Sequence, residues 1–257
     1  MLGAIAGDIV GSIYERHPIK TMAFPLFSNT STFTDDTVLT VAVAYAILNS
    51  IDYAEAIKTF GQRYPHAGYG GSFFSWLQSE DSQPYNSWGN GSAMRVSPVG
   101  YAFETKEAVL AEAQKSAAIT HNHPEGIKGA QAVSLAVFLA QQGSSKHEIR
   151  EEISTRFDYN LEQTLKEIRP TYHFDVSCQG SVPQSIIAFL ESESFEDAIR
   201  KAISLGGDSD TMACITGAIA EAHYGAIPER ITQEVNKRLP EAFLQVIDAF
   251  RERFIIK

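Results

Sequence analysis

Apolar residues recur along most of the chain at spacings of three and four, which is the period of an α-helix. Sustained alternation of apolar and polar residues, the usual sign of a β-strand, is nearly absent. The pattern predicts an all-α protein with about a dozen helices of ordinary length. These helices are expected to begin near Leu2, Asp36, Tyr53, Lys106, Glu125, His147, Leu161, Pro183, Phe195, Asp210, Glu229 and Glu241.

Two of the expected helices, over residues 36–48 and 125–141, carry apolar residues on nearly every face. Such helices are buried at the centre of a larger all-α domain, with amphipathic helices around them. The stretch 61–101 differs, because Gly, Ser, Tyr, Trp and Asn are frequent in it. It is expected to be a long loop, and a long ordered loop in a compact domain is usually functional.

The length of 257 residues is sufficient for one domain with a large core, and a single domain over residues 1–257 is expected. No apolar run approaches the roughly 20 residues of a membrane span, and the first residues lack the basic segment of a secretory signal. Only Cys178 and Cys214 are present, with neither a disulfide pattern nor the spacing of a zinc site. We therefore expect a cytoplasmic protein that does not cross a membrane.

The formal net charge of −10 argues against a protein that grips the backbone of a nucleic acid over a wide surface. Such binding depends on many Lys and Arg side chains that displace counterions from the phosphates. No extended nucleic-acid surface is expected. A phosphate group in a ligand would have to be bound locally.

Acidic clusters occur at residues 34–37 (Thr-Asp-Asp-Thr) and 206–211 (Gly-Gly-Asp-Ser-Asp-Thr), each directly before an apolar helical run. One interpretation is helix capping, because Asp, Ser and Thr accept the free N–H groups of a first turn. The other is a metal site, because neighbouring carboxylates beside buried helices repel each other unless a cation lies between them. Asp and Thr oxygens without His or Cys favour magnesium or manganese. An EF-hand is disfavoured, since Ile219 stands at the twelfth position from Asp208.

The first segment adds a third acidic element, since Asp8, Ser12 and Glu15 recur at spacings of four and three and so share one face of a helix. On a second face, glycines at positions 3, 7 and 11 would let another backbone approach closely. The segments 68–72 and 88–95 could offer backbone N–H groups, an Arg and aromatic faces to a diphosphate and a ribose, although neither has Walker or dinucleotide-loop spacing.

Five segments in this order resemble the ADP-ribosylglycohydrolase family, which includes the dinitrogenase reductase-activating glycohydrolases and the ADP-ribosyl-acceptor hydrolases. They are residues 3–8 followed by Glu15, 33–37, 89–95, 120–121 and 206–211. The resemblance spans nearly the whole chain. It implies a compact single-domain orthogonal bundle of many helices that hydrolyses the bond between ADP-ribose and an acceptor.

The resemblance also implies the residues of the site. Two magnesium ions, or manganese in some members, would be held by Thr34, Asp35, Asp36, Asp208, Asp210 and Thr211. ADP-ribose would lie against Gly70 and Gly71 near its diphosphate, and against Asn90, Gly91, Ser92, Met94 and His121. Glu15 matches a family glutamate that sits above the metals. Glu15, Asp35 or Asp36 could accept the proton of the attacking water, and Glu15 is favoured if it does not bind a metal itself.

Three alternatives to this hydrolase are a metal-dependent phosphohydrolase, a module that binds ADP-ribose without turnover, and a structural role like that of some lens crystallins. Intact metal ligands argue against the last. The expected partners are ADP-ribose and an ADP-ribosylated substrate, whose acceptor is arginine, serine, a nucleic acid or the acetyl group of O-acetyl-ADP-ribose. Some members that act on arginine carry an acidic residue where this chain has Ser87, Trp88 and Gly89. The oligomeric state is not predicted.

Overall fold

A computed structural model describes residues 1–255. Helices occur along the whole of this range, as the helical pattern of the sequence predicts. Within that range there is no β-strand, which confirms the all-α prediction. The helices are α1 (Leu2–Gly11), α2 (Asp35–Asn49), α3 (Tyr53–Arg63), α4 (Gly71–Gln78), α5 (Gly91–Met94), α6 (Ser97–Ala102), α7 (Lys106–Ala118), α8 (Pro124–Gln141), α9 (Lys146–Phe157), α10 (Leu165–Ile168), α11 (Cys178–Leu190), α12 (Phe195–Ile203), α13 (Ser209–Tyr224), α14 (Glu229–Asn236) and α15 (Glu241–Phe254).

The main errors in the predicted helices have local causes. The helix expected from Pro183 begins at Cys178 instead, because the hydroxyl of Ser177 caps the backbone N–H of Gly180 at 3.0 Å. Pro183 lies inside this helix, where it lacks one donor. The stretch 61–101 is not one long loop, since it contains α4, α5 and α6. The apolar residues Phe73 and Leu77, four positions apart, bury one face of α4.

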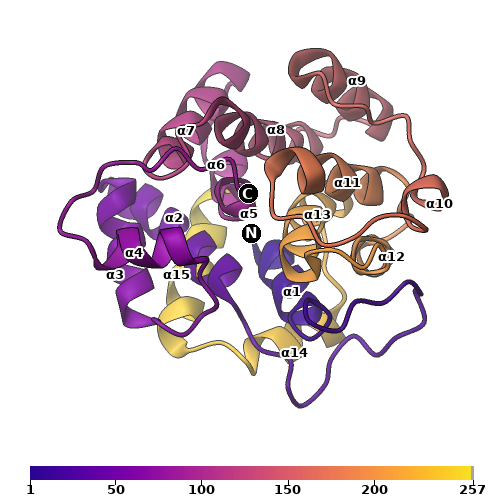
Figure 1. Cartoon of the computed structure of the whole chain (residues 1–257), viewed down its shortest axis with the longest axis horizontal. Helices are drawn as coiled ribbons and strands as arrows, with labels where there is room; N and C mark the ends of the chain where they lie inside the picture. The colour runs from indigo at the N-terminus through magenta and orange to yellow at the C-terminus, as the bar shows by residue number, and fades with distance from the viewer. Residues whose placement is uncertain (256–257) are drawn as a thin grey trace.

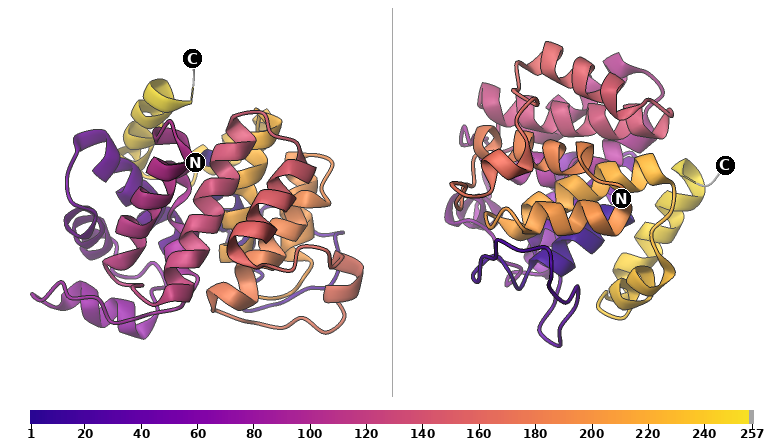
Figure 2. Two further views of the ribbon diagram at one scale, coloured as in Figure 1. Left: turned by 90° about the horizontal axis from the view of Figure 1, so that it is seen from above. Right: turned by 90° about the vertical axis from the view of Figure 1, so that its right-hand side faces the viewer.

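Helices α1 and α13 lie side by side near the middle of the molecule (Figure 1). On one side of them α2 packs against α3 and α15, and on the other side α11 and α12 cover α13. Helix α8 lies against α6, α7 and α13, and the two further views show the same arrangement (Figure 2). As predicted, α2 and α8 are buried over most of their length, and α13 is buried to the same degree. The core is one continuous cluster of apolar side chains.

Three glycines of α1 explain how closely it approaches α13. A Cβ atom on Gly3 would lie 2.3 Å from the carbonyl oxygen of Gly217, and one on Gly7 would lie 2.0 Å from that of Ala213. One on Gly11 would lie 2.5 Å from the Cα of Asp210. The helices are therefore antiparallel and nearly in backbone contact. Of the three glycines, Gly11 lies against the first turn of α13.

We expect Gly7→Ala to destabilise the protein by about 3 kcal/mol, the upper part of the range for an overfilled core. The added methyl group meets backbone atoms of Ala213, which cannot rotate away. Urea unfolding measures the loss. Gly71→Ala is the matched control, because Gly71 is also helical but has open space around it. Equal stability of the two variants would show that the contact between α1 and α13 is looser than described.

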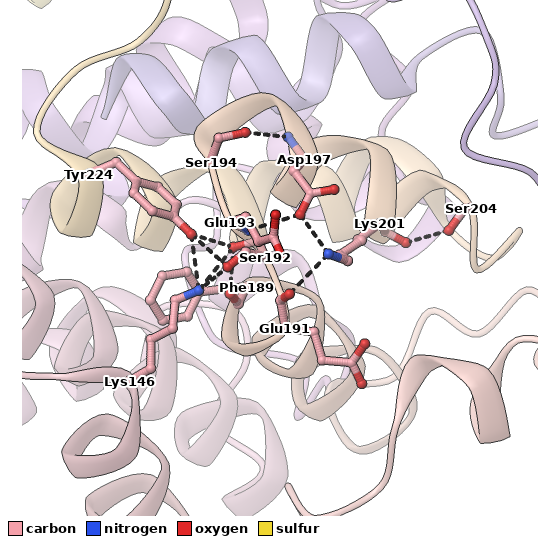
Figure 3. A network of polar contacts seen from close by, with 10 residues as sticks. All are labelled: Lys146, Phe189, Glu191, Ser192, Glu193, Ser194, Asp197, Lys201, Ser204 and Tyr224. Carbon is pink, nitrogen blue, oxygen red and sulfur yellow. Dashed lines mark hydrogen bonds and ion pairs between the residues drawn. The ribbon is translucent and has the colours of Figure 1, made fainter.

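A polar network joins the ends of several helices (Figure 3). The ammonium group of Lys146 donates to the carbonyl oxygen of Ser192 and, at 3.0 Å, to the hydroxyl oxygen of Tyr224. The Tyr224 hydroxyl donates to the same carbonyl at 2.8 Å. Lys201 of α12 donates to the carbonyl oxygen of Glu191, which directly follows α11, at 2.9 Å. These contacts join α9, α11, α12 and α13. None of these residues lines the large cavity described below.

Within residues 1–255 no helix is both long enough and apolar enough to span a membrane. The predicted domain over 1–257 includes residues 256 and 257, which lie outside the described residues.

Candidate active site

Two helix N-termini that carry carboxylates meet where α2 and α13 begin. Helix α2 starts at Asp35 and Asp36 after its N-cap Thr34, and α13 follows its N-cap Asp208. The hydroxyl of Thr211, in the first turn of α13, donates to Oδ2 of Asp36 at 3.3 Å. The two acidic clusters of the sequence, far apart in the chain, are therefore in direct contact.

Asp8 of α1 ties the start of α2 to this cluster. Its carboxylate accepts bonds from the backbone N–H and hydroxyl of Thr34, at 2.9 and 2.7 Å, and from those of Thr37, at 3.1 and 2.5 Å. Burial raises the pKa of Asp8 to about 6, although these donors oppose the rise. Sequence reasoning did not include Asp8 among the metal ligands. Its signal was a charged residue within an otherwise apolar helix, because the nine other residues of α1 are Gly, Ala, Ile, Leu or Val.

The carboxylates form two groups that share Asp210. One group is Asp8, Asp36 and Asp210, and the other is Glu15, Asp208 and Asp210. Within each group, one oxygen of each residue lies within 4.8 Å of the others. This spacing allows a single cation to contact all three residues of a group.

Among residues 1–255, none of these carboxylates forms a salt bridge with a cationic side chain. Burial raises the pKa of Asp35 to about 8, and the charge of Asp8 adds to the rise. Burial, followed by neighbouring carboxylates, holds the pKa values of Asp36 and Asp210 well above the ordinary range. Oδ1 of Asp36 is buried without a hydrogen-bond partner. An all-oxygen set of this kind fits a hard divalent cation such as Mg²⁺ or Mn²⁺.

We expect the metal-free protein to lose stability as the pH rises from about 4 to about 8. The folded-state pKa values of Asp8, about 6, and Asp35, about 8, lie above the ordinary 3.8, so the folded protein keeps protons that the unfolded chain has released. This contribution is complete below about pH 3.8 and is lost through about 6 and about 8. Thermal unfolding in EDTA at about pH 5 and about pH 8 tests this dependence.

Added Mg²⁺ is expected to raise the Tm by roughly 5–10 °C at the higher pH and by less at the lower one. Asp36→Asn should weaken both the pH dependence and the response to Mg²⁺. A Tm at about pH 8 that does not respond to Mg²⁺ or Mn²⁺ would contradict a cation site here.

Glu15 does not lie on α1 with Asp8, as the sequence interpretation had it. The helix ends at Gly11, and Glu15 follows in the next turn, half-buried. Burial raises its pKa, and the charge of Asp208 adds to this, while Arg16 lowers it. The turn places the Glu15 carboxylate at the edge of the cluster, where it also lines a cavity.

This cavity of about 570 Å³ is lined by the carboxylates of the cluster other than Asp8, and by every predicted site residue except Ser92. Gly70 and Gly71 form the start of α4, with open space beside both Cα atoms. The first N–H groups of α4 have no partner within the helix, so they can meet an anion. This part of the wall therefore suits a phosphate oxygen.

Asn90 and Met94 connect the cavity wall to α13. The side-chain amide of Asn90 donates to Oδ2 of Asp208 at 2.8 Å, and the sulfur of Met94 lies 3.9 Å from the hydroxyl of Thr211. Gly91 leaves room for the imidazole of His121, since a Cβ on Gly91 would lie 3.2 Å from Nε2. These residues hold the short helix α5 against the metal-binding candidates.

Ser92 is placed differently from the rest of its motif. It is fully buried, and its hydroxyl donates to the carbonyl oxygen of Gly126 on α8 at 2.7 Å. Its side chain does not line the cavity. Ser92 can therefore affect a ligand only through the position of α5.

Three apolar residues lie at the rim of the cavity, and sequence reasoning missed two of them, Phe174 and Val176. Trp88, Phe174 and Val176 line it with about half of their surface exposed, at 54%, 50% and 53%. Residues 174–178 run beside the loop before α5, and the N–H of Asn90 donates to the carbonyl oxygen of Val176 at 2.8 Å. The segment before α11 carries no motif, so only the fold brings it to the cavity.

Comparisons with known proteins agree on one family. The protein-family model described as ADP-ribosylglycohydrolase matches residues 1–255 of this chain. The chain is 28% identical to ADP-ribosylhydrolase ARH3 of Mus musculus, over 100% of this chain and 88% of the relative, and 26% identical to that of Homo sapiens, over 100% and 90%. A solved structure named "ADP-ribosylglycohydrolase-related protein complex" shares the fold with a TM-score of 0.79 at 22% identity, over 98% of this chain and 95% of the other.

Proposed function

Because the chain belongs to the ADP-ribosylglycohydrolase family, and is thus an ADP-ribosyl hydrolase, we propose that it uses two divalent cations to cleave ADP-ribose from an acceptor. Mg²⁺ is the favoured ion, with Mn²⁺ as the alternative. The observation that carries the proposal is the sharing of Asp210 between two carboxylate groups, whose members other than Asp8 line the cavity. Two adjacent groups of oxygen ligands would suit two adjacent cations.

The ligands of these cations would come from Thr34, Asp35, Asp36, Asp208, Asp210 and Thr211, and the position of Asp8 adds a further carboxylate. Bound cations would neutralise the buried charges and act as Lewis acids toward the oxygens of the substrate. Asp8 would hold α2 in place through its four hydrogen bonds. Asn90 would orient Asp208.

The proton of the attacking water would pass to Glu15. Its raised pKa and half-buried position suit a group that accepts a proton near neutral pH. Asp36 is more buried and is the better candidate for a metal ligand. A bound cation would lower the pKa of Asp36, so that its carboxylate could no longer act as the base. Glu15 thus remains the favoured base over Asp35 and Asp36.

The rest of the cavity offers complementary surfaces to ADP-ribose. The N-terminus of α4 at Gly70 and Gly71 would receive the diphosphate, and His121 would add a donor. The exposed ring of Trp88 would give the adenine a flat apolar face. A ligand that spans the cavity would then have its ribose beside the carboxylates.

Release of free ADP-ribose from arginine-, serine-, nucleic-acid- and acetyl-linked substrates tests the proposal and identifies the acceptor. Each reaction is run with Mg²⁺, with Mn²⁺ and with EDTA. The proposal requires release from at least one substrate, with loss of activity in EDTA. Release that persists in EDTA, after extraction of the metal has been verified by elemental analysis, would contradict the proposed cation site.

A further inference from the structure

Arg95 is a fully buried arginine in the wall of the cavity, and its guanidinium forms no ion pair among residues 1–255. Its Nη2 donates to the carbonyl oxygen of Ser116 and to Oγ1 of Thr120, both at 2.9 Å. Nε and Nη1 have no hydrogen-bond partner. Burial of a charged group without an ion pair costs folding free energy, which indicates that Arg95 has a function.

The hydroxyl of Thr120 links Arg95 to His121 through hydrogen bonds. The Thr120 hydroxyl lies 2.7 Å from Nδ1 of His121, and Arg95 and His121 are its only side-chain partners in the described chain. Arginine can only donate, so Thr120 accepts from Arg95. The buried Thr120 hydroxyl proton then has one available acceptor, which is Nδ1 of His121.

The opposite tautomer, Nδ1–H, would leave one hydrogen-bond donor in this arrangement without an acceptor. If Nδ1 carried the proton, the Thr120 hydroxyl would accept from both neighbours, and its own proton would be buried without an acceptor. A buried unsatisfied hydroxyl costs about 1–3 kcal/mol. The hydrogen bonds therefore favour His121 with Nδ1 unprotonated and the proton on Nε2.

The Nε2 side of His121 faces the loop before α5. Nε2 lies 3.2 Å from the site of a Cβ on Gly91 and 3.5 Å from that on Gly89, and no residue in 1–255 hydrogen-bonds to it. His121 also lines the cavity. The absence of side chains at both glycines leaves this donor accessible to a ligand.

We propose that Arg95 and Thr120 are positioning residues that hold His121 as the neutral Nε2–H tautomer, ready to donate to an anionic oxygen of the ligand. The functional part rests on the proposed binding of ADP-ribose, whose diphosphate supplies such oxygens. Burial and the charge of Arg95 both lower the pKa of His121, in agreement with a neutral ring. Selection of one tautomer in advance removes a rearrangement from the binding step.

The test is NMR of the full-length protein with ¹⁵N-labelled histidine, which distinguishes protonated from unprotonated ring nitrogens. The sequence has 7 histidines, and His121→Gln identifies the relevant signals. Wild-type protein should show the Nε2–H form. Thr120→Val, which is nearly isosteric, should give a mixture of tautomers, and Thr120→Ser should restore the single form. Ser116→Ala should leave the signals in place, because the Ser116 hydroxyl has no partner.

Titration with ADP-ribose and Mg²⁺ adds the functional readout. Thr120→Val should weaken ADP-ribose binding about five- to tenfold, and Thr120→Ser should recover most of it. A wild-type signal for Nδ1–H, or an unchanged tautomer in Thr120→Val, would overturn the inference. The Nε2–H form in a protein that does not bind ADP-ribose would support the hydrogen-bond relay and contradict the proposed function instead.

Discussion

Asp210→Asn is expected to reduce ADP-ribose release by on the order of 10³-fold and to abolish stabilisation by Mg²⁺. Removal of a group that only orients a metal ligand already lowers metal affinity or activity by about 10–100-fold. Asp210 belongs to both carboxylate groups, so its loss weakens both. Asparagine keeps the size of the side chain and removes one buried charge. The metal-free variant should therefore be more stable than the metal-free wild type, because the pKa of Asp210 is raised by burial and by its acidic neighbours.

Asp248→Asn is the matched control for this variant. Asp248 is exposed on α15, away from the cavity, and its substitution removes the same charge. It should leave activity and the response to Mg²⁺ close to those of the wild type. Turnover by Asp210→Asn within about tenfold of the wild type would rule out the assignment of Asp210 as a shared ligand, since even supporting groups cost that much.

Glu15→Gln is expected to lower kcat by about 10²-fold or more, the usual contribution of a general base. Glutamine keeps the shape of Glu15 but accepts no proton near neutral pH. If Glu15 acts as the base and not as a ligand, ADP-ribose affinity and the Mg²⁺-dependent rise in Tm should change little. Steady-state kinetics and thermal unfolding, measured on the same preparation, separate these effects.

Glu241→Gln, an exposed change of the same kind on α15, controls for the loss of one charge. Loss of Mg²⁺-dependent stabilisation in Glu15→Gln, to the degree seen in Asp210→Asn, would assign Glu15 as a metal ligand. Unchanged kcat would remove it from the reaction. The proximity of its carboxylate to Asp208 and Asp210 makes this distinction necessary.

Much of the fold was predictable because most of its helices have local signals in the sequence. The apolar runs of α2 and α8 identified the buried helices, and Thr34 marked the start of α2 as an N-cap. The region of α4 to α6 was misjudged because Gly, Ser and Asn lower helix propensity, whereas tertiary burial of Phe73 and Trp76 stabilises α4. Pro183 misled the prediction of α11, since a proline usually marks the first turn.

The candidate site was partly predictable for a different reason. The two acidic clusters are short motifs at helix starts, and the structure brings them together with Glu15 at the cavity. Asp8 was not predicted as part of the cluster, because its contact with Asp36 and Asp210 depends on how closely α1 packs against α13. The rim residues Phe174 and Val176 depend on the path of a segment distant in sequence. Such contacts have no local signature.

The most direct test of the central claim is mass spectrometry of the products formed from an ADP-ribosylated acceptor in Mg²⁺. The substrate is one that the panel identifies, or each member of the panel if none releases ADP-ribose. Cleavage of the glycosidic bond predicts intact ADP-ribose and the unmodified acceptor, with the formation of both strongly reduced in Asp210→Asn. AMP as the first product would show a phosphohydrolase, and bound but uncleaved substrate would show a binding module. Either result would contradict the proposed reaction.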